Sequence, residues 1–396
     1  MKKSAAIAAL LITGCAQNAG PPGDGERLHA RLLTLDSHLD TPVHFQRADW
    51  DFGSRHVYGE DFSQVDIPRM KSGALDGGFF VIFTPQGPLT PQGYADALAF
   101  ARRRSDLIDA ELVRHKHRIE PVLTAVDAER AAARGRLVAF KSMENGYPLG
   151  ENPGLLAEFR SRGVRLAGPV HSKTNQLADS ATDAPRWNGL SPLGREWVAE
   201  MNRLGMVIDA SHASDAALDE MLALSTTPVL LSHSGSRAVF DHPRNLDDDR
   251  IRKLAAAGGA VCVSTVYLSA MNMTDERAAL FDKMERIGEL PVTEQRAIAA
   301  HWVALDRREP MWSATVDMFV RMILHLIEVA GVDHVCMGAD WDGGGGIDGL
   351  GDITRLPDVT ARLRAGGLSD ADLARIWSGN LLRVLRAAES HATAER

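Results

Sequence analysis

Short apolar runs recur along the chain, and a stretch with helical spacing of its apolar residues follows most of them. Runs of this length, bounded by polar or glycine-containing segments, are typical of buried strands. We therefore expect eight strands, at 32–36, 78–83, 137–141, 164–168, 206–210, 229–232, 260–264 and 335–339. Their alternation with helical patterns predicts parallel rather than antiparallel pairing.

The clearest helical pattern covers 96–118, where leucines and alanines share one side and arginines the other. Further helices are expected at 193–204, 216–224, 251–257, 276–287, 293–305 and 313–330, and Ser214 is placed to cap the second of these. Strand–helix alternation of this kind favours an α/β fold, a (β/α)8 TIM-type barrel. The long connections 50–76 and 265–333 predict inserted loops and helices that cap the C-terminal mouth.

Composition supports this picture and excludes others. Hydrophobic residues make up 45% and charged residues 24% of 396 residues, as in an ordinary globular protein. Lys and Arg number 44 and Asp and Glu 52, a net charge of −8, which argues against a nucleic-acid partner. We expect one barrel domain over residues 28–390.

The first residues predict a targeting signal rather than part of the fold. Lys2 and Lys3 precede an apolar run at 5–12 that is too short to span a bilayer. The segment 12–15, which ends in Cys15, resembles the lipobox of bacterial lipoproteins. The alternative is an ordinary signal peptide with an incidental cysteine. We expect residues 1–15 to be a lipoprotein signal with a lipidated Cys15, and 16–27 a flexible tether.

This reading places the protein in the bacterial cell envelope, facing the periplasm. Ala16 follows the cysteine where an Asp would indicate retention in the inner membrane, which favours the outer membrane. The mature chain then has two further cysteines, Cys262 and Cys336, both in apolar runs. That setting favours buried free thiols and leaves a disulfide between them as the alternative.

Polar residues end several of the expected strands, where a (β/α)8 barrel places its active site. His38 and Asp40 stand two apart in an extended segment, so their side chains share a face. His212 and His233 each end an apolar run with Ser-His, one strand–helix unit apart. Imidazole and carboxylate groups that converge on one point are typical metal ligands.

Two other strand ends carry candidate groups. Glu144 ends the third run and can bridge two ions, whereas Lys141, which could do so as a carbamate, falls on the opposite strand face. Asp340 ends the eighth run at a position suited to an acid–base group. Arg244 can clamp a carboxylate or can pair on the surface with the aspartates 247–249, and its position alone does not decide between them.

Together these segments resemble the zinc-dependent membrane dipeptidase family, also called renal dipeptidase-like. The motifs are DSHLDTP (36–42), MENG (143–146), HSKTN (171–175), DASH (209–212), SHS (232–234), PRNL (243–246) and GADWDG (338–343). They follow the family's order and span most of the mature chain. Departures are mild: Asn145 replaces a glycine and Trp341 a phenylalanine.

The resemblance implies a binuclear zinc site. His38 and Asp40 would bind one ion, His212 and His233 the other, and Glu144 would bridge them. A hydroxide between the two ions would attack the scissile carbonyl of a dipeptide.

It also implies roles for residues outside the metal set. His171 would contact the substrate and the developing oxyanion, and Asp340 would shuttle the proton to the leaving amine. Arg244 would hold the free C-terminal carboxylate, with Asn245 beside it in the substrate site. Tolerance of a C-terminal D-residue is implied as well. The family is often dimeric, which allows a homodimer.

Two alternative functions remain open. One is a related two-metal amidohydrolase for N-acyl amino acids or lactones, and the other is a catalytically silent peptide-binding or metal-binding lipoprotein.

Overall fold

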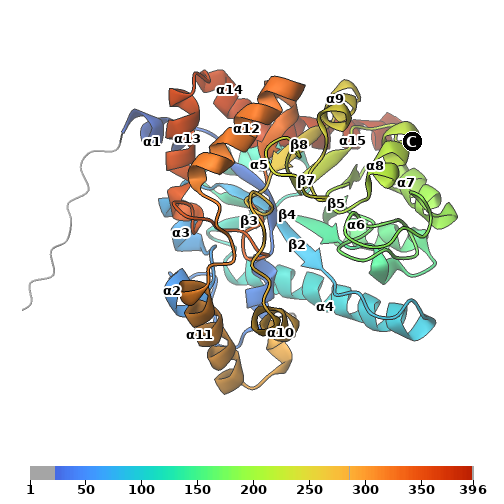
Figure 1. The fold of residues 1–396 in the computed structure, drawn as a ribbon, viewed down its shortest axis with the longest axis horizontal. Helices are drawn as coiled ribbons and strands as arrows, with labels where there is room; N and C mark the ends of the chain where they lie inside the picture. The colour runs from blue at the N-terminus through green and yellow to red at the C-terminus, as the bar shows by residue number, and fades with distance from the viewer. Residues whose placement is uncertain (1–22, 285, 395–396) are drawn as a thin grey trace, which may run out of the picture.

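Parallel strands ringed by helices form the centre of the molecule (Figure 1). The computed structural model describes residues 23–284 and 286–394. The strands are β1 (Leu35–Leu39), β2 (Gly77–Phe83), β3 (Ile119–Pro121), β4 (Leu137–Glu144), β5 (Val164–Ala167), β6 (Val207–Ile208), β7 (Leu230–Ser234), β8 (Ala260–Val263) and β9 (Val335–Met337). The predicted signal peptide with Cys15, and the tether as far as residue 22, lie outside the described residues.

The strands pair in parallel in the order β1-β2-β4-β5-β6 and, in a second sheet, β7-β8-β9. Two single parallel bridges connect the sheets, Asp209 with Leu230 and Leu39 with Trp341. The eight strands therefore close into the expected (β/α)8 barrel. The short β3 was not predicted; it pairs with the beginning of β4 and lies off the main path.

Helices cover the outside of the strands. They are α1 (Asp24–His29), α2 (Tyr58–Asp61), α3 (Ile67–Ser72), α4 (Pro91–Arg114), α5 (Ala125–Ala133), α6 (Leu156–Ser161), α7 (Pro192–Leu204), α8 (Asp215–Leu224), α9 (Asp248–Ala256), α10 (Asp275–Met284), α11 (Val292–Arg308), α12 (Val316–Ala330), α13 (Leu356–Ala365), α14 (Asp370–Ala374) and α15 (Asn380–Ala394). Ser214 caps α8 as predicted, because its side chain accepts a hydrogen bond from the backbone of Ala217. None of the described helices is both long enough and apolar enough to cross a membrane.

The start of the fold differs from the prediction. Helix α1 lies partly within the expected tether, and the ring of its last residue, His29, lies 2.7 Å from the Thr360 hydroxyl on α13. The turn after α1 occupies the residues predicted to open the first strand, so β1 begins at Leu35. His38 therefore lies inside β1 rather than after it.

Alternating side chains along the strands separate an inner from an outer apolar layer. Phe79 and Phe140 belong to the inner cluster, whereas Phe80 and Met143 belong to the outer one beneath the helices. The inner cluster draws on the first residues of the strands and on Leu381 and other apolar residues of α15. Since apolar packing fills the barrel from that end, the polar strand ends meet at the opposite, carboxyl end.

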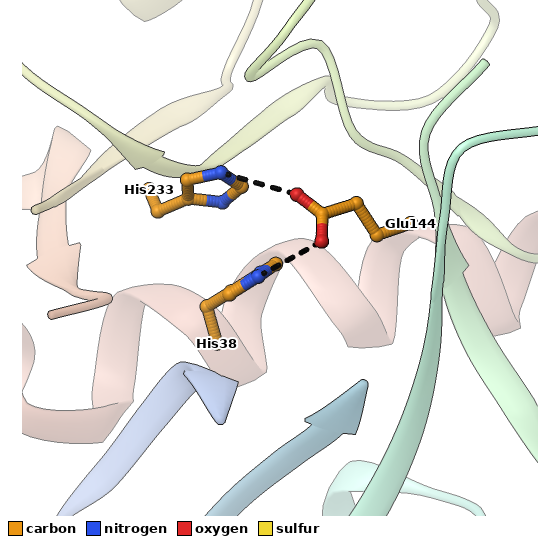
Figure 2. Close-up of side chains that lie close together, drawn as sticks. All are labelled: His38, Glu144 and His233. Atoms are coloured by element: carbon orange, nitrogen blue, oxygen red, sulfur yellow. Dashed lines mark ion pairs between the residues drawn. The ribbon is translucent and has the colours of Figure 1, made fainter. Parts of the chain in front are cut away.

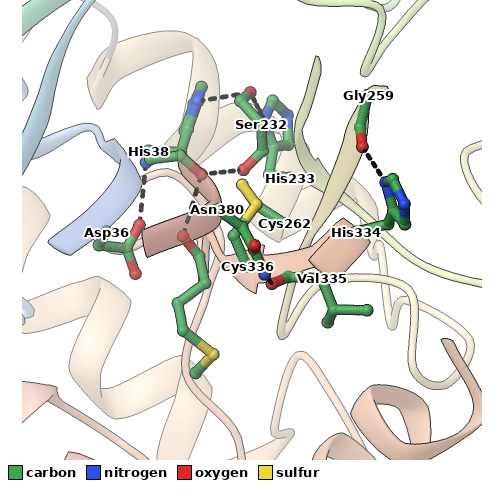
Figure 3. Close-up of a disulfide and its surroundings, with 12 residues drawn as sticks. Asp36, His38, Ser232, His233, Gly259, Cys262, His334, Val335, Cys336 and Asn380 are labelled. Atoms are coloured by element: carbon green, nitrogen blue, oxygen red, sulfur yellow. Dashed lines mark hydrogen bonds between the residues drawn. A yellow bond between two sulfur atoms is a disulfide. The ribbon is translucent and has the colours of Figure 1, made fainter. Parts of the chain in front are cut away.

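The two cysteines form a disulfide, so the expectation of free thiols was wrong. Cys262 on β8 lies directly opposite Cys336 on β9 in the parallel register, and both side chains are buried in the inner cluster. Figure 3 shows the bond beside the end of β7. Adjacent strands fixed at this register bring the two sulfur atoms together, which the separate apolar runs did not reveal.

The long insertion after β8 covers the mouth as predicted. Phe281 and Met284 of α10 line a pocket that also contains Asp40, Glu144 and His171. Helix α10 therefore forms one wall above the carboxyl ends of the strands.

Candidate active site

Five side chains from four parts of the barrel converge at its carboxyl end, and we call them the strand-end cluster. His38 comes from β1, Glu144 is the last residue of β4, and His233 lies in β7. Asp40 directly follows β1, and His212 follows β6. The barrel brings them together because parallel strands end at the same edge.

Glu144 lies between the two halves of the cluster (Figure 2). Its Oε2 is 3.5 Å from Nε2 of His38. Its Oε1 is 2.9 Å from Nε2 of His212 and 3.5 Å from Nε2 of His233. One carboxylate oxygen thus faces His38, and the other faces His212 and His233.

His38 connects Glu144 to two further carboxylates. Its Nε2 lies 3.2 Å from Oδ2 of Asp40 and 3.9 Å from Oδ1 of Asp340. This nitrogen is buried and has no hydrogen-bond partner. Three acidic groups therefore surround one buried ring atom.

Burial and charge separate the histidines into two kinds. Burial, reinforced by nearby positive charges, holds the pKa of His212 and of His233 well below the ordinary value, so both rings are neutral. For His38, burial alone would lower the pKa, but the Glu144 and Asp40 carboxylates raise it well above its usual range. Burial, with Asp40 and Glu144 adding to it, raises the pKa of Asp340 to about 8.

A hydrogen-bond chain orients the ring of His233, and Figure 3 shows its last contact, between Ser232 and His233. The Ser232 hydroxyl lies 2.5 Å from Oδ2 of Asp209 and 2.8 Å from Nδ1 of His233. An ionised carboxylate only accepts, so the hydroxyl donates to Asp209 and accepts from Nδ1–H of His233. The lone pair of His233 Nε2 is thereby directed at Glu144 and His212.

The cluster fits a metal centre on its own geometry. The Nε2 atoms of two neutral rings, His212 and His233, lie 2.9 Å apart, an arrangement that a shared cation would stabilise. His38, Glu144 and His233 offer ligand atoms within 4.8 Å of one another, as do His38, Asp40 and Asp340. Imidazole nitrogen with carboxylate oxygen is a donor set that suits zinc and related ions.

Arg244 approaches the cluster from the loop after β7. Its guanidinium is buried and donates to the carbonyl of His233 at 3.3 Å. Nε and Nη1 are buried without a partner. The surface alternative is wrong, because Asp247 caps α9 and pairs with Arg250 instead. A buried guanidinium with two unused donors is a site for an anion.

Comparisons with known proteins agree with this geometry. The membrane dipeptidase family, peptidase family M19, matches residues 24–396. This chain belongs to that family. Dipeptidase tcpJ of Claviceps purpurea is 30% identical over 371 residues, which are 91% of this chain and 78% of tcpJ.

Solved structures agree as well. The probable dipeptidase PvdM of Pseudomonas aeruginosa is 30% identical, with a TM-score of 0.79 over 93% of this chain and 98% of that one. A metallopeptidase of Rhodobacter sphaeroides shares the fold, with 24% identity and a TM-score of 0.69 over 90% of this chain and 99% of that one. The protein is therefore a dipeptidase of a metallopeptidase family.

The remaining predicted residues of the dipeptidase fall in three places. His171 reaches the cluster, with Nε2 3.9 Å from Oε1 of Glu144, and its ring packs against Phe83. The amide of Asn245 donates to the carbonyls of Phe240 and Tyr267 and so holds the loops around Arg244, and its place in the substrate site stays a prediction. Lys141 faces outward as expected and pairs with Asp109 at 2.7 Å, which leaves Glu144 as the bridging candidate.

Backbone conformation explains two features of the dipeptidase motifs. Asn145, Asp340 and Asp342 all have positive φ angles, between 65° and 71°. Asn and Asp tolerate this region better than most residues, so Asn145 can stand where the family often has glycine. A Cβ at Gly343 would lie 2.1 Å from Oδ2 of Asp40 and 2.4 Å from Oδ1 of Asp340, so any side chain at this position would collide with both carboxylates.

The sequence analysis missed the residues that support the ligands of the dipeptidase. Asp36 accepts from the backbone N–H groups of His38 and Ala339 and so ties β1 to the Asp340 segment. Asp209 accepts from the hydroxyls of Ser211 and Ser232. A signal existed: both aspartates precede a strand-end histidine by two or three residues within an apolar run.

A second group, Asp51, Glu111 and His115, also lies within 4.8 Å and we call it the Asp51 cluster. Here Nη2 of Arg118 lies 2.9 Å from Nδ1 of His115. Because a guanidinium only donates, Nδ1 accepts and Nε2 carries the ring proton. A metal on Nε2 would require a doubly deprotonated ring, so this cluster does not suit a metal.

Proposed function

We propose that the protein is a binuclear zinc dipeptidase that hydrolyses dipeptides with a free C-terminal carboxylate. The observation that carries this proposal is the position of Glu144, with one oxygen toward His38 and the other toward His212 and His233. A carboxylate placed between two sets of ligands is the group that would bridge two ions.

His38 and Asp40 would hold one ion and His212 and His233 the other. Zinc in such a site polarises a carbonyl and makes water acidic enough to act as a nucleophile near neutral pH. The supporting features are the neutral rings of His212 and His233 and the unpartnered Nε2 of His38.

The chain's own residues then bind and orient the substrate. Arg244 pairs with the terminal carboxylate through its unused nitrogen atoms, which fixes the end of the dipeptide below His233. His171, which is partly exposed, faces the developing oxyanion of the scissile carbonyl. Cations bound beside Asp340 would favour its ionised form. It would then accept a proton from the attacking water and donate it to the leaving amine nitrogen.

This anchoring would allow a D-residue at the C-terminal position. Arg244 would hold the carboxylate and the bound ions would polarise the carbonyl, so neither contact would depend on the direction of the C-terminal side chain. We expect L-Ala-L-Ala and L-Ala-D-Ala both to be cleaved. The second is a natural probe, because the Rhodobacter sphaeroides metallopeptidase is liganded with a phosphinate mimic of it.

The test uses protein without residues 1–15, loaded with zinc, and measures amino-acid release with and without a chelator. Chelator-sensitive release from both dipeptides, with two zinc ions per chain by elemental analysis, is the expected result. Bound zinc with no release from any dipeptide would reject dipeptide hydrolysis and favour N-acyl amino acids or lactones as substrates.

Two variants test the assigned roles. Arg244→Met keeps apolar packing and should raise KM, with a binding loss on the order of 2–5 kcal/mol. Arg237→Met is the matched control, because Arg237 pairs with Asp215 outside the cluster and KM should not change. Asp340→Asn should keep zinc and lower kcat; full turnover would reject the proton-transfer role.

We also propose that Cys15 carries a lipid that anchors the dipeptidase to the cell envelope on the periplasmic side. The support is the lipobox-like segment before it. A Cys15→Ala variant expressed in a bacterium should lose incorporation of labelled fatty acid and leave the membrane fraction. Unchanged membrane association with no label in either protein would reject the anchor.

A further inference from the structure

Arg104 is a buried arginine that borders the active-site pocket. It lies in the middle of α4 and is 4% exposed. It lines the pocket of about 130 Å³ that contains Asp40, Glu144 and His171. It also lines a second cleft of about 620 Å³, between α4 and the segments 45–50 and 288–289. Arg104 therefore borders both spaces.

Within the described residues, Arg104 makes no hydrogen bond and no ion pair, and its one close aromatic contact is with Phe100. The acidic residues on the cleft side already have partners: Asp106 pairs with Arg162, Glu111 with Arg114 and Glu289 with Arg286. Burial lowers the pKa of Arg104 to about 10, with Asp40 opposing, so the group stays charged at neutral pH. A buried charge without a partner is costly and calls for an explanation.

Asp40 is the nearest candidate to balance this charge, but it has another task. Its Oδ2 lies 3.2 Å from Nε2 of His38 within the strand-end cluster. Once Asp40 binds a cation, its charge is committed there. Of the other two carboxylates that line the pocket, Glu144 belongs to the strand-end cluster, and Asp342 accepts from the backbone of Gln64 and from Thr41. Arg104 then faces the pocket as a free cation.

Arg104 and Arg244 border different parts of the strand-end cluster. Arg244 contacts His233 on β7, whereas Arg104 shares its pocket with Asp40 after β1. With the C-terminal carboxylate on Arg244, the N-terminal residue of the dipeptide extends toward Arg104. The apolar residues that line this pocket are Val43, Phe83, Phe281 and Met284. The volume equals that of roughly four water molecules and suits a short side chain.

We propose that Arg104 forms an anion-binding subsite that selects dipeptides with an acidic N-terminal residue. The apolar walls would hold the methylene groups of a glutamate, and the guanidinium would pair with its carboxylate. This inference rests on the proposed function, because it uses Arg244 to fix the direction of the substrate.

The test compares substrates that differ only in one charge. L-Glu-L-Ala and L-Gln-L-Ala have nearly the same shape, so the ratio of their kcat/KM values isolates the carboxylate. We expect the zinc-loaded enzyme to prefer the glutamate substrate about tenfold to a hundredfold, as for a charge-assisted hydrogen bond. Equal values in the wild-type enzyme would overturn the inference, whatever the variants do.

Three variants sharpen the assignment. Arg104→Met should remove the preference and leave L-Gln-L-Ala cleavage close to the wild-type rate, whereas Arg104→Lys should restore part of it. Arg103→Met, at the exposed neighbouring position, is the control and should keep the full preference. An equal loss for both substrates in Arg104→Met would overturn the subsite and assign Arg104 to positioning Asp40.

A second substrate pair separates the two ends of the site. L-Ala-L-Glu and L-Ala-L-Gln should show no preference that depends on Arg104. A preference at this end instead would overturn the proposed direction. Failure of the proposed function looks different, since zinc-loaded protein would then cleave none of these dipeptides.

Discussion

The strand-end cluster and the Asp51 cluster contain the same kinds of side chain, yet only the first is suited to a metal. Each brings histidine and carboxylate groups within 4.8 Å. In the first, a serine that donates to Asp209 must accept from His233, which leaves the outer ring nitrogen free to bind. In the second, Arg118 donates to His115, so the outer nitrogen carries a proton.

The difference shows that residue type and proximity do not define a metal site. The tautomer of each ring decides whether a lone pair or an N–H faces the carboxylates. That tautomer is fixed by the hydrogen-bond partner of the other ring nitrogen. In metal sites this partner is commonly a carboxylate, a backbone carbonyl or a water molecule. Four predictions test this comparison.

The largest effect is expected from Glu144→Gln. This substitution keeps the size of the side chain and removes the negative charge that lies between His38 on one side and His212 and His233 on the other. We expect bound zinc to fall and turnover to drop by about a thousandfold, because both ions lose a ligand. Elemental analysis and dipeptide hydrolysis measure the two effects. The same substitution in the other cluster, Glu111→Gln, should change neither; a matching loss of zinc there would break the comparison.

Removal of the metal should destabilise the protein through the first cluster alone. A ligand at about 100 times its Kd stabilises the folded state by about 3 kcal/mol, so a chelator should lower Tm by several degrees. Differential scanning calorimetry measures the shift. The Glu144→Gln variant should show little further shift, and a full shift in that variant would place the stabilising metal elsewhere.

Asp209→Asn should weaken zinc binding by about 10- to 100-fold, the usual range for a residue that supports a ligand. An amide at this position no longer compels Ser232 to accept from His233. Competition with a coloured chelator gives the affinity. Asp51→Asn is the control, and an unchanged affinity in Asp209→Asn would show that the ring orientation does not depend on this chain.

The smallest effect is expected from His115→Gln in the Asp51 cluster. Its contact with Asp51 is half-exposed, so we expect the free energy of unfolding to fall by only about 1 kcal/mol. Denaturant unfolding measures this change, and zinc content and kcat should match the wild type. A missing zinc ion in this variant would show that the Asp51 cluster binds metal after all.

Much of the fold followed from the pattern of apolar runs. Each of the eight expected strands is present, and α7, α8 and α12 lie close to their predicted bounds. The exceptions are local. Residues 32–34 belong to the turn after α1, and the three-residue β3 is too short to give a periodic signal.

The candidate site was predicted where residue type and position sufficed. His38, Glu144, His212 and His233 stand at strand ends, and the barrel geometry that brings them together is a general property of parallel strands. The sequence did not indicate that the amide of Asn245 holds two loops, and it had no means of pairing Cys262 with Cys336. Those contacts depend on the register between strands.

The sequence by itself determined the barrel, its polar strand ends and the family to which the chain belongs. Each of these follows from short-range order: apolar periodicity, residue type and motif order. Only the tertiary structure decided which nitrogen of His233 carries the proton, why Gly343 must lack a side chain, and which donors of the buried Arg244 have no partner. These features depend on contacts between atoms that the fold brings together from segments far apart in the sequence.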